Sequence, residues 1–150
     1  MDIKSKEARS RNMSKIRSKD TQPEKYIRSA LFRRNHRYRV NSNAVEGHPD
    51  IYFPRLNAAI FVHGCYWHRH NGCKYAYIPK SNSEFWLAKF ETNKTRDATV
   101  YNALKNHGVR VLIIWECTVR KMMGNADFHN ETVAQIENFI LKKEPAFSEI

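Results

Sequence analysis

The side chains best suited to chemistry gather in one short stretch near the middle of the chain. Cys65, His70 and Cys73 follow one another with the spacing C-x4-H-x2-C. The third and last cysteine, Cys117, comes directly after an apolar run at 109–115 and a glutamate. Three thiolates and one imidazole suit a closed tetrahedral zinc site, whose purpose would be to hold an irregular loop in shape. The alternative is three buried free thiols and a surface histidine.

A second set of candidate groups surrounds the apolar run at 58–63. Asp50 opens a short apolar segment just upstream, and His63 ends the run. A hairpin would bring Asp50 and the end of this run to one sheet edge, where a carboxylate and a free strand-end carbonyl offer the hard oxygen ligands that Mg²⁺ selects. His63 and His68 would then handle protons or contact a phosphate. Two other readings stay open: Asp50 could simply bond a turn, and His68 could compete for zinc.

The charge balance points to a polyanionic partner. The chain carries 26 Lys and Arg against 15 Asp and Glu, a net charge of +11. A domain this basic usually meets nucleic acid, although a merely solvated basic surface is the alternative. Basic residues are dense at 4–19, where large apolar residues are few. We predict that residues 1–19 form a basic arm that follows a phosphate backbone, with salt-dependent affinity.

Size and composition predict one globular domain at 20–150. The chain has 150 residues, of which 41% are hydrophobic, enough for a single core. It contains no apolar run of the roughly 18–20 residues that a membrane span needs, and it begins without an apolar leader segment. We therefore expect a cytoplasmic protein without membrane association. An odd number of cysteines argues against a closed set of disulfides.

The apolar periodicity predicts a mixed sheet flanked by helices, an α/β class. The first helix starts at Thr21, with Glu24 placed as in a capping box, and ends near Arg34. The segments near 50–53 and 58–63 are predicted to form an antiparallel hairpin. The remaining predicted elements are a short strand near 38–40, helices at 84–90 and 94–107, a buried strand at 109–115 and a last helix around 133–140.

Several segments together resemble the very short patch repair (Vsr) DNA mismatch endonucleases. The similarity covers about residues 8–120, in order and at family-like spacing, and it is highly specific. The segments that carry it are Arg9-Ser10-Arg11-Asn12-Met13, Asp20-Thr21, Glu24-Lys25, Pro49-Asp50, Phe61-Val62-His63-Gly64-Cys65-Tyr66-Trp67-His68, Glu84-Phe85-Trp86, Arg96-Asp97 and Arg110-Val111-Leu112-Ile113-Ile114-Trp115-Glu116-Cys117.

The resemblance implies a restriction-endonuclease-like fold and a specific reaction. The family nicks one strand of duplex DNA on the 5′ side of the thymine in a T:G mismatch, which arises when 5-methylcytosine deaminates. It implies Mg²⁺ as the catalytic metal and Zn²⁺ as a structural one. Family members work beside a cytosine-5 methyltransferase and with mismatch-repair proteins. An asymmetric mismatch fits a monomer.

The resemblance also assigns roles to the residues of the hydrolytic site. Asp50 matches the acidic metal ligand, and Val62 occupies the position whose main-chain carbonyl binds the metal. The family usually has Thr at that position, but a backbone ligand should survive the change of side chain. His68 matches the general base. The remaining matches are His63 and Asp97 near the scissile phosphate, and an acidic residue, Glu24, which we expect to orient His68.

Two further residue sets follow from the resemblance. Cys65, His70, Cys73 and Cys117 match the structural zinc ligands, although the gap between His70 and Cys73 is one residue longer than in the family. The second set consists of side chains that wedge into the DNA near the mismatch. These are Met13, Tyr66 and Trp67, with Tyr66 in place of the more usual Phe.

The sequence leaves two other functions to compare with this one. The first is a zinc-stabilised DNA-binding module without catalysis, for which Asp50, His63 and His68 would serve no purpose. The second is a related nuclease with a broader choice of mismatch or sequence, because groove contacts cannot be placed from one chain.

Overall fold

The computed structural model describes residues 19–150, so Met13 and most of the predicted basic arm lie outside the described residues. Five strands form one mixed sheet in the order β1-β2-β3-β4-β5. The first two pairings are antiparallel and the last two are parallel. The strands are β1 (Arg39–Val40), β2 (Ile51–Phe53), β3 (Ala58–His63), β4 (Arg110–Trp115) and β5 (Phe147–Glu149).

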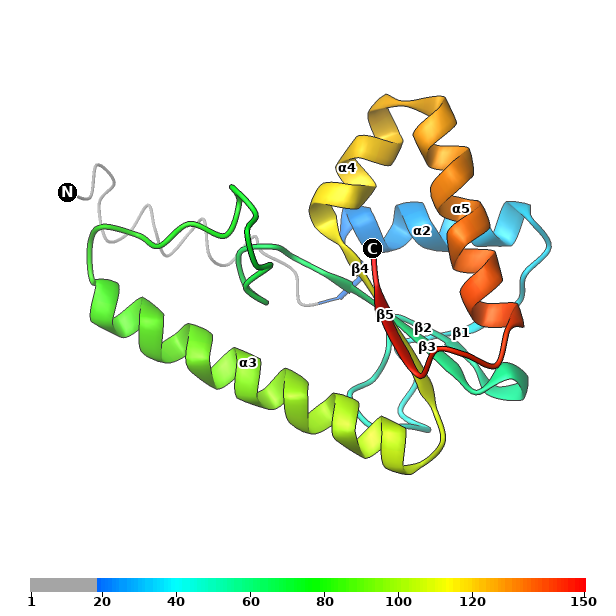
Figure 1. The fold of residues 1–150 in the computed structure, drawn as a ribbon, viewed down its shortest axis with the longest axis horizontal. Coiled ribbons are helices and arrows are strands. Elements are labelled where there is room, and N and C mark those ends of the chain that lie inside the picture. The colour runs from blue at the N-terminus through cyan, green and yellow to red at the C-terminus, as the bar shows by residue number, and fades with distance from the viewer. Residues whose placement is uncertain (1–18) are drawn as a thin grey trace.

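Helices cover both faces of the sheet. On one face lie α2 (Gln22–Arg33), α4 (Glu116–Gly124) and α5 (Ala126–Leu141), and on the other lies the long helix α3 (Ser83–Asn106) (Figure 1). Apolar side chains of β3 alternate between the two faces: Ile60 packs with the first group of helices, whereas Phe61 packs with residues near α3. Both β3 and β4 are buried along their whole length. None of the helices in 19–150 is long and apolar enough to span a membrane.

The central hairpin forms as the sequence predicts. β2 pairs with β3 across a short 3-10 helix at Pro54–Leu56, whose C-cap Asn57 adopts a left-handed conformation. β4 lies beside β3 with His63 opposite Trp115, so both strands end at the same edge of the sheet. The Thr21 hydroxyl caps α2 by accepting a hydrogen bond from the Glu24 N–H, which confirms the predicted helix start.

The two helices predicted at 84–90 and 94–107 are wrong, because α3 is one continuous helix of 24 residues. The predicted gap contains Thr92 and Asn93, whose side chains can compete for backbone hydrogen bonds. Thr92 instead donates its hydroxyl to the carbonyl of Ala88, and Asn93 donates its amide to the carbonyl of Trp67. With their side chains so engaged, neither residue interrupts the backbone ladder.

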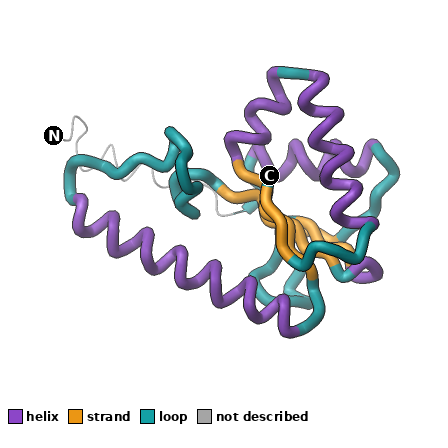
Figure 2. The backbone as a smooth tube through the Cα atoms, viewed as in Figure 1, coloured by secondary structure: helices purple, strands orange, loops and turns teal. Residues whose placement is uncertain are grey.

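Helix α4 and strand β5 were not predicted. Val119 and Met122, three residues apart and both buried, attach α4 to the core, but this short pattern directly follows a strong strand. β5 has a largely exposed side-chain pattern that gives no strand signal, and its pairing with β4 holds it in place. The smooth trace in Figure 2 shows that the loop between β3 and α3 extends beyond the sheet, where it meets the N-terminal half of α3.

Candidate active site and metal centres

Asp50 and Val62 meet at the edge where β2 begins. The Asp50 carboxylate accepts a hydrogen bond of 2.7 Å from the main-chain N–H of Val62. β2 starts one residue after Asp50, so β3 has no strand partner on that side at this point. The N–H and C=O of one strand residue point to the same side, so the Val62 carbonyl faces the same gap as Asp50. The sheet edge therefore offers a carboxylate and a peptide oxygen together, as predicted for a hard cation.

Arg28 connects α2 to this edge of the sheet. Its guanidinium donates two hydrogen bonds, of 3.1 and 3.3 Å, to the main-chain carbonyl of Asp50. It also forms an ion pair of 2.7 Å with Asp20 and contacts the buried carboxylate of Glu24 at 3.5 Å. Glu24 in turn accepts the main-chain N–H of Asp20 at 2.7 Å. Arg28 thus offsets two neighbouring acidic groups, a role that the sequence reasoning missed.

The electrostatic surroundings of Asp50 suit a carboxyl group that binds a cation. Burial, and after it the charge of Glu24, raises the pKa of the Asp50 carboxyl to about 7. The Val62 N–H, Arg28 and His68 act in the opposite direction. The negative charge of the buried Glu24 disfavours ionisation of the partly buried Asp50, and a divalent cation bound at Asp50 would offset this repulsion. His68 stacks on His63, the residue after Val62 in β3, so its imidazole lies at the same end of β3 as the contact between Asp50 and Val62.

Two parallel imidazoles stand beside this edge. The rings of His63 and His68 stack with their centroids 3.7 Å apart and their planes 8° from parallel. His68 Nδ1 bonds the carboxylate of Asp97 at 2.7 Å, and His63 Nδ1 bonds the hydroxyl of Tyr101 at 3.2 Å. Asp97, rather than Glu24, is therefore the carboxylate that holds His68. Asp97 and Tyr101 lie one turn apart on α3, which presents both to the histidine pair.

The stack favours proton handling over joint metal binding. An imidazole binds a metal in the plane of its ring, and two parallel planes cannot contain the same ion unless one ring turns. Burial, and after it the charge of His68, lowers the pKa of His63 well below its usual range. With its Nδ1–H donated to the Asp97 carboxylate, His68 keeps a lone pair on Nε2 that can accept a proton.

The four predicted zinc ligands converge where β3 and β4 end, around Trp115. Cys65, His70, Cys73 and Cys117 each place one donor atom within 4.8 Å of the others. Tight turns shape the loop, since the His70 N–H bonds the Cys65 carbonyl and the Cys73 N–H bonds the His70 carbonyl. Cys117 reaches the cluster because parallel β3 and β4 end together. The ring of His70 stacks on Trp115 at 4.2 Å, which fixes the imidazole in place.

The cluster has the size and chemistry of a metal site. Thiolate–zinc bonds of about 2.3 Å require donor atoms about 3.8 Å apart in a tetrahedron, so a modest contraction would close this one. Burial raises the pKa of the Cys65 thiol, so that a cation would have to displace its proton. The one-residue insertion before Cys73 does not exclude His70, whose Nδ1 lies 3.4 Å from the Cys117 sulfur.

An aromatic cluster joins the loop that carries Cys65, His70 and Cys73 to α3. The ring of Tyr66 packs edge-on against Trp67 at 5.0 Å and against Phe90 at 5.2 Å. Trp86 lies 5.9 Å from Trp67 and 6.0 Å from Tyr66, so it extends the predicted pair into a larger aromatic surface. Phe85, next to Trp86, is 61% exposed. The sequence reasoning used Trp86 only for the resemblance and missed this contact, which required the fold of the loop.

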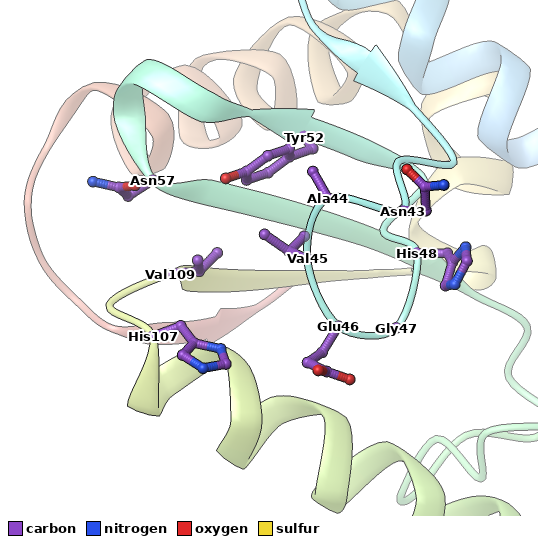
Figure 3. Close-up of a pocket in the computed structure, with 10 residues that line it drawn as sticks. All are labelled: Asn43, Ala44, Val45, Glu46, Gly47, His48, Tyr52, Asn57, His107 and Val109. Carbon is purple, nitrogen blue, oxygen red and sulfur yellow. The ribbon is translucent and has the colours of Figure 1, made fainter.

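A hollow of about 370 Å³ lies at the opposite end of the sheet from the histidines. Figure 3 shows its lining from the loop at 43–48, the start of β4 and the end of α3. The loop approaches closely because Gly47 has φ +78° and a Cβ there would lie 2.4 Å from a methyl carbon of Val100. His107 and Glu46 stand at this remote site. The acidic and histidine groups described above lie outside this hollow.

The comparisons agree with the geometry. Residues 1–74 match the family model described as DNA mismatch endonuclease Vsr. The chain is 39% identical over 119 residues to the DNA mismatch endonuclease Vsr of Escherichia coli, covering 79% of this chain and 76% of that protein. It is 37% identical over 139 residues to the type II nicking enzyme V.NmeAIP of Neisseria meningitidis, covering 93% and 99%. It is 43% identical over 105 residues to the type II nicking enzyme V.XorIIP of Xanthomonas oryzae, covering 70% and 76%. The chain belongs to the Vsr family of DNA mismatch endonucleases.

Proposed function

We propose that this protein is a Mg²⁺-dependent endonuclease that nicks one strand of duplex DNA 5′ of the thymine in a T:G mismatch. The observation that carries the proposal is the contact between Asp50 and Val62, with His63 as the next residue of β3 and His68 stacked on it. A DNA-binding module without catalysis would need no such arrangement. The mixed sheet flanked by helices supports a restriction-endonuclease-like fold for residues 20–150, with residues 1–19 as a DNA-binding arm. We propose a monomer that acts alongside mismatch-repair proteins.

Each residue of the site has its own role in phosphodiester hydrolysis. A Mg²⁺ ion held by Asp50 and the Val62 carbonyl would polarise the scissile phosphate and stabilise the leaving 3′ oxygen. His68 accepts the proton of the attacking water on Nε2, and Asp97 holds the ring and stabilises the imidazolium that forms. His63, stacked on His68, contacts the phosphate. Glu24 adds negative charge beside Asp50, which strengthens the attraction for a divalent cation.

A defined duplex tests the reaction. Each strand of a duplex with one T:G pair carries a different label, and the protein is added with Mg²⁺ or with EDTA. We expect a single nick on the thymine strand, on its 5′ side, only with Mg²⁺. The same duplex with a T:A or C:G pair serves as the matched control. Cleavage of both strands, of the guanine strand, or of the matched duplexes at the same rate would contradict the proposal.

Trp67→Ala should lose mismatch binding while keeping the fold. Separating stacked base pairs costs a few kcal/mol, and less at a mismatch, so an inserted aromatic ring favours T:G over a matched pair. We expect the ratio of T:G to T:A affinity to fall by about tenfold or more, because base–aromatic stacking contributes roughly 1–3 kcal/mol. Fluorescence anisotropy with both duplexes measures the ratio. Wild-type discrimination and nicking by this variant would remove the wedge role.

We propose Zn²⁺ as the ion of the Cys/His cluster. Zinc removal should expose the three thiols to a thiol reagent, whereas the metal-bound protein should protect them. His70→Ala should weaken zinc binding by more than the roughly 10–100-fold that loss of an outer contact costs. His107→Ala, an exposed histidine at the far end of α3, is the matched control and should bind zinc normally. Purified protein without zinc and with three reactive native thiols would refute the assignment.

A further inference from the structure

Helix α3 carries a tyrosine that neither the sequence reasoning nor the family resemblance singled out. Tyr101 lies one turn after Asp97, and both side chains reach the stacked histidines. Asp97 bonds His68 Nδ1 at 2.7 Å, whereas the Tyr101 hydroxyl bonds His63 Nδ1 at 3.2 Å. Two groups on one face of α3 therefore bond the Nδ1 atoms of the two rings. Asp97 is a carboxylate, which accepts hydrogen bonds, whereas Tyr101 is a phenol, which has a proton to donate.

Packing fixes the position of the Tyr101 hydroxyl. The tyrosine ring lies 6.0 Å from Phe61 at an interplanar angle of 65°, and 5.5 Å from Phe147 in β5. It also lies 6.1 Å from the His63 ring itself, with the planes 28° apart. Side chains from β3 and β5 thus surround the ring on α3. With the ring so held, the hydroxyl remains directed at His63.

The direction of each hydrogen bond follows from the chemistry of its partner. An ionised carboxylate only accepts, so His68 donates its Nδ1–H to Asp97 and keeps its lone pair on Nε2. A phenol carries one proton to donate, and His63 Nδ1 is the one partner of the Tyr101 hydroxyl among residues 19–150. A hydrogen bond donated by the phenol to His63 Nδ1 uses this proton, and it requires the proton of the His63 ring to lie on Nε2.

We propose that Tyr101 is a positioning residue that sets the tautomer of His63, so that the two stacked rings hold opposite tautomers. His68 offers a lone pair on Nε2 and accepts a proton from water. His63 offers an N–H on Nε2 and donates a hydrogen bond to a phosphate oxygen. The stack thus provides a base and a donor side by side, and two residues one turn apart on α3 assign the roles. The inference rests on the proposed hydrolytic function of this edge.

The conservative variant Tyr101→Phe removes the hydroxyl and keeps the packed ring. Tyr26→Phe is the matched control, because Tyr26 also bonds a histidine Nδ1, that of His129 in α5, away from the histidine stack. Long-range ¹H–¹⁵N correlation spectra of the protein labelled with ¹⁵N-histidine, recorded without DNA, report which nitrogen carries each proton. This readout does not depend on nicking, so it separates failure of the inference from failure of the proposed function.

We expect wild-type His63 to be protonated on Nε2 and wild-type His68 on Nδ1. Tyr101→Phe should shift the Nδ1 resonance of His63 and leave His68 unchanged, whereas Tyr26→Phe should alter neither ring. In nicking of a T:G duplex, Tyr101→Phe should lower kcat by about tenfold, the effect of one hydrogen bond, with KM changed by less than about twofold. A proton on His63 Nδ1 in the wild type, or unchanged spectra and kcat in Tyr101→Phe, would overturn the inference.

Discussion

Asp50→Asn is expected to abolish nicking of a T:G duplex while leaving the protein folded. The substitution removes the charged metal ligand but keeps an oxygen that can accept the Val62 N–H. Metal ions contribute several kcal/mol to hydrolysis of this kind, so we expect the single-turnover rate to fall by at least about 10³-fold. Glu46→Gln, which neutralises an exposed acid in the loop at 43–48, is the matched control and should keep the wild-type rate.

The same variant has a stability signature in the metal-free protein. The pKa of Asp50 is raised to about 7, above its ordinary value near 3.8, so the folded state holds this proton more tightly than the unfolded chain does. Asp50 therefore lowers the free energy of unfolding as the pH rises from about 4 to about 7. Asp50→Asn should lack this loss and unfold at an equal or higher temperature than wild type at pH 8. Activity near wild type would show that Asp50 is not a metal ligand.

His68→Ala should reduce the nicking rate by about 10²–10⁴-fold, the usual contribution of a general base. The side chain is partly exposed at the sheet edge, so its removal should leave DNA affinity and thermal unfolding close to wild type. Single-turnover nicking and anisotropy with the same T:G duplex separate the two effects. His107→Ala, which changes an exposed histidine at the C-terminal end of α3, should be neutral.

The proposed base would be refuted by His68→Ala nicking within about tenfold of wild type under saturating Mg²⁺. A second variant sharpens the result. Asp97→Asn keeps the shape of the side chain that bonds His68 but removes its charge. It should lose activity to a smaller extent than His68→Ala, because the ring remains in place and only its orientation and charge balance change. If both variants are as stable as the wild type, their loss of activity comes from the reaction and not from the fold.

The strands that position Asp50, Val62 and the Cys/His cluster could be predicted because their sequence signals are local. Six consecutive residues of β3 are buried, and this requires an apolar run that is visible in the sequence. The parallel pairing of β3 with β4 then carries Cys117 to Cys65, so the Cys/His cluster followed from two strand predictions and one spacing. The contact between Asp50 and Val62 could be predicted for the same reason, because a short hairpin leaves few alternative pairings of its two strands.

The contacts that the sequence did not predict depend on how α3 lies across the sheet. Asp97 and His68 are far apart in sequence, and the irregular loop between them gives no measure of distance. Once Asp97 is placed, Tyr101 follows at one helical turn, and this spacing is the signal that could have found it. Arg28 escaped notice because a lone arginine in a basic chain reads as surface charge. Its role depends on the main-chain carbonyl of Asp50, which no sequence pattern displays.

The most direct test of the account is to locate a metal in crystals of the protein with an uncleaved T:G duplex. Mn²⁺ can replace Mg²⁺ with oxygen ligands and is visible by anomalous scattering. The account predicts an anomalous peak within bonding distance of an Asp50 carboxylate oxygen and the Val62 carbonyl, beside His68 and the scissile phosphate. A peak that lies away from both oxygens, or no peak at this edge while the duplex is bound there, would contradict it.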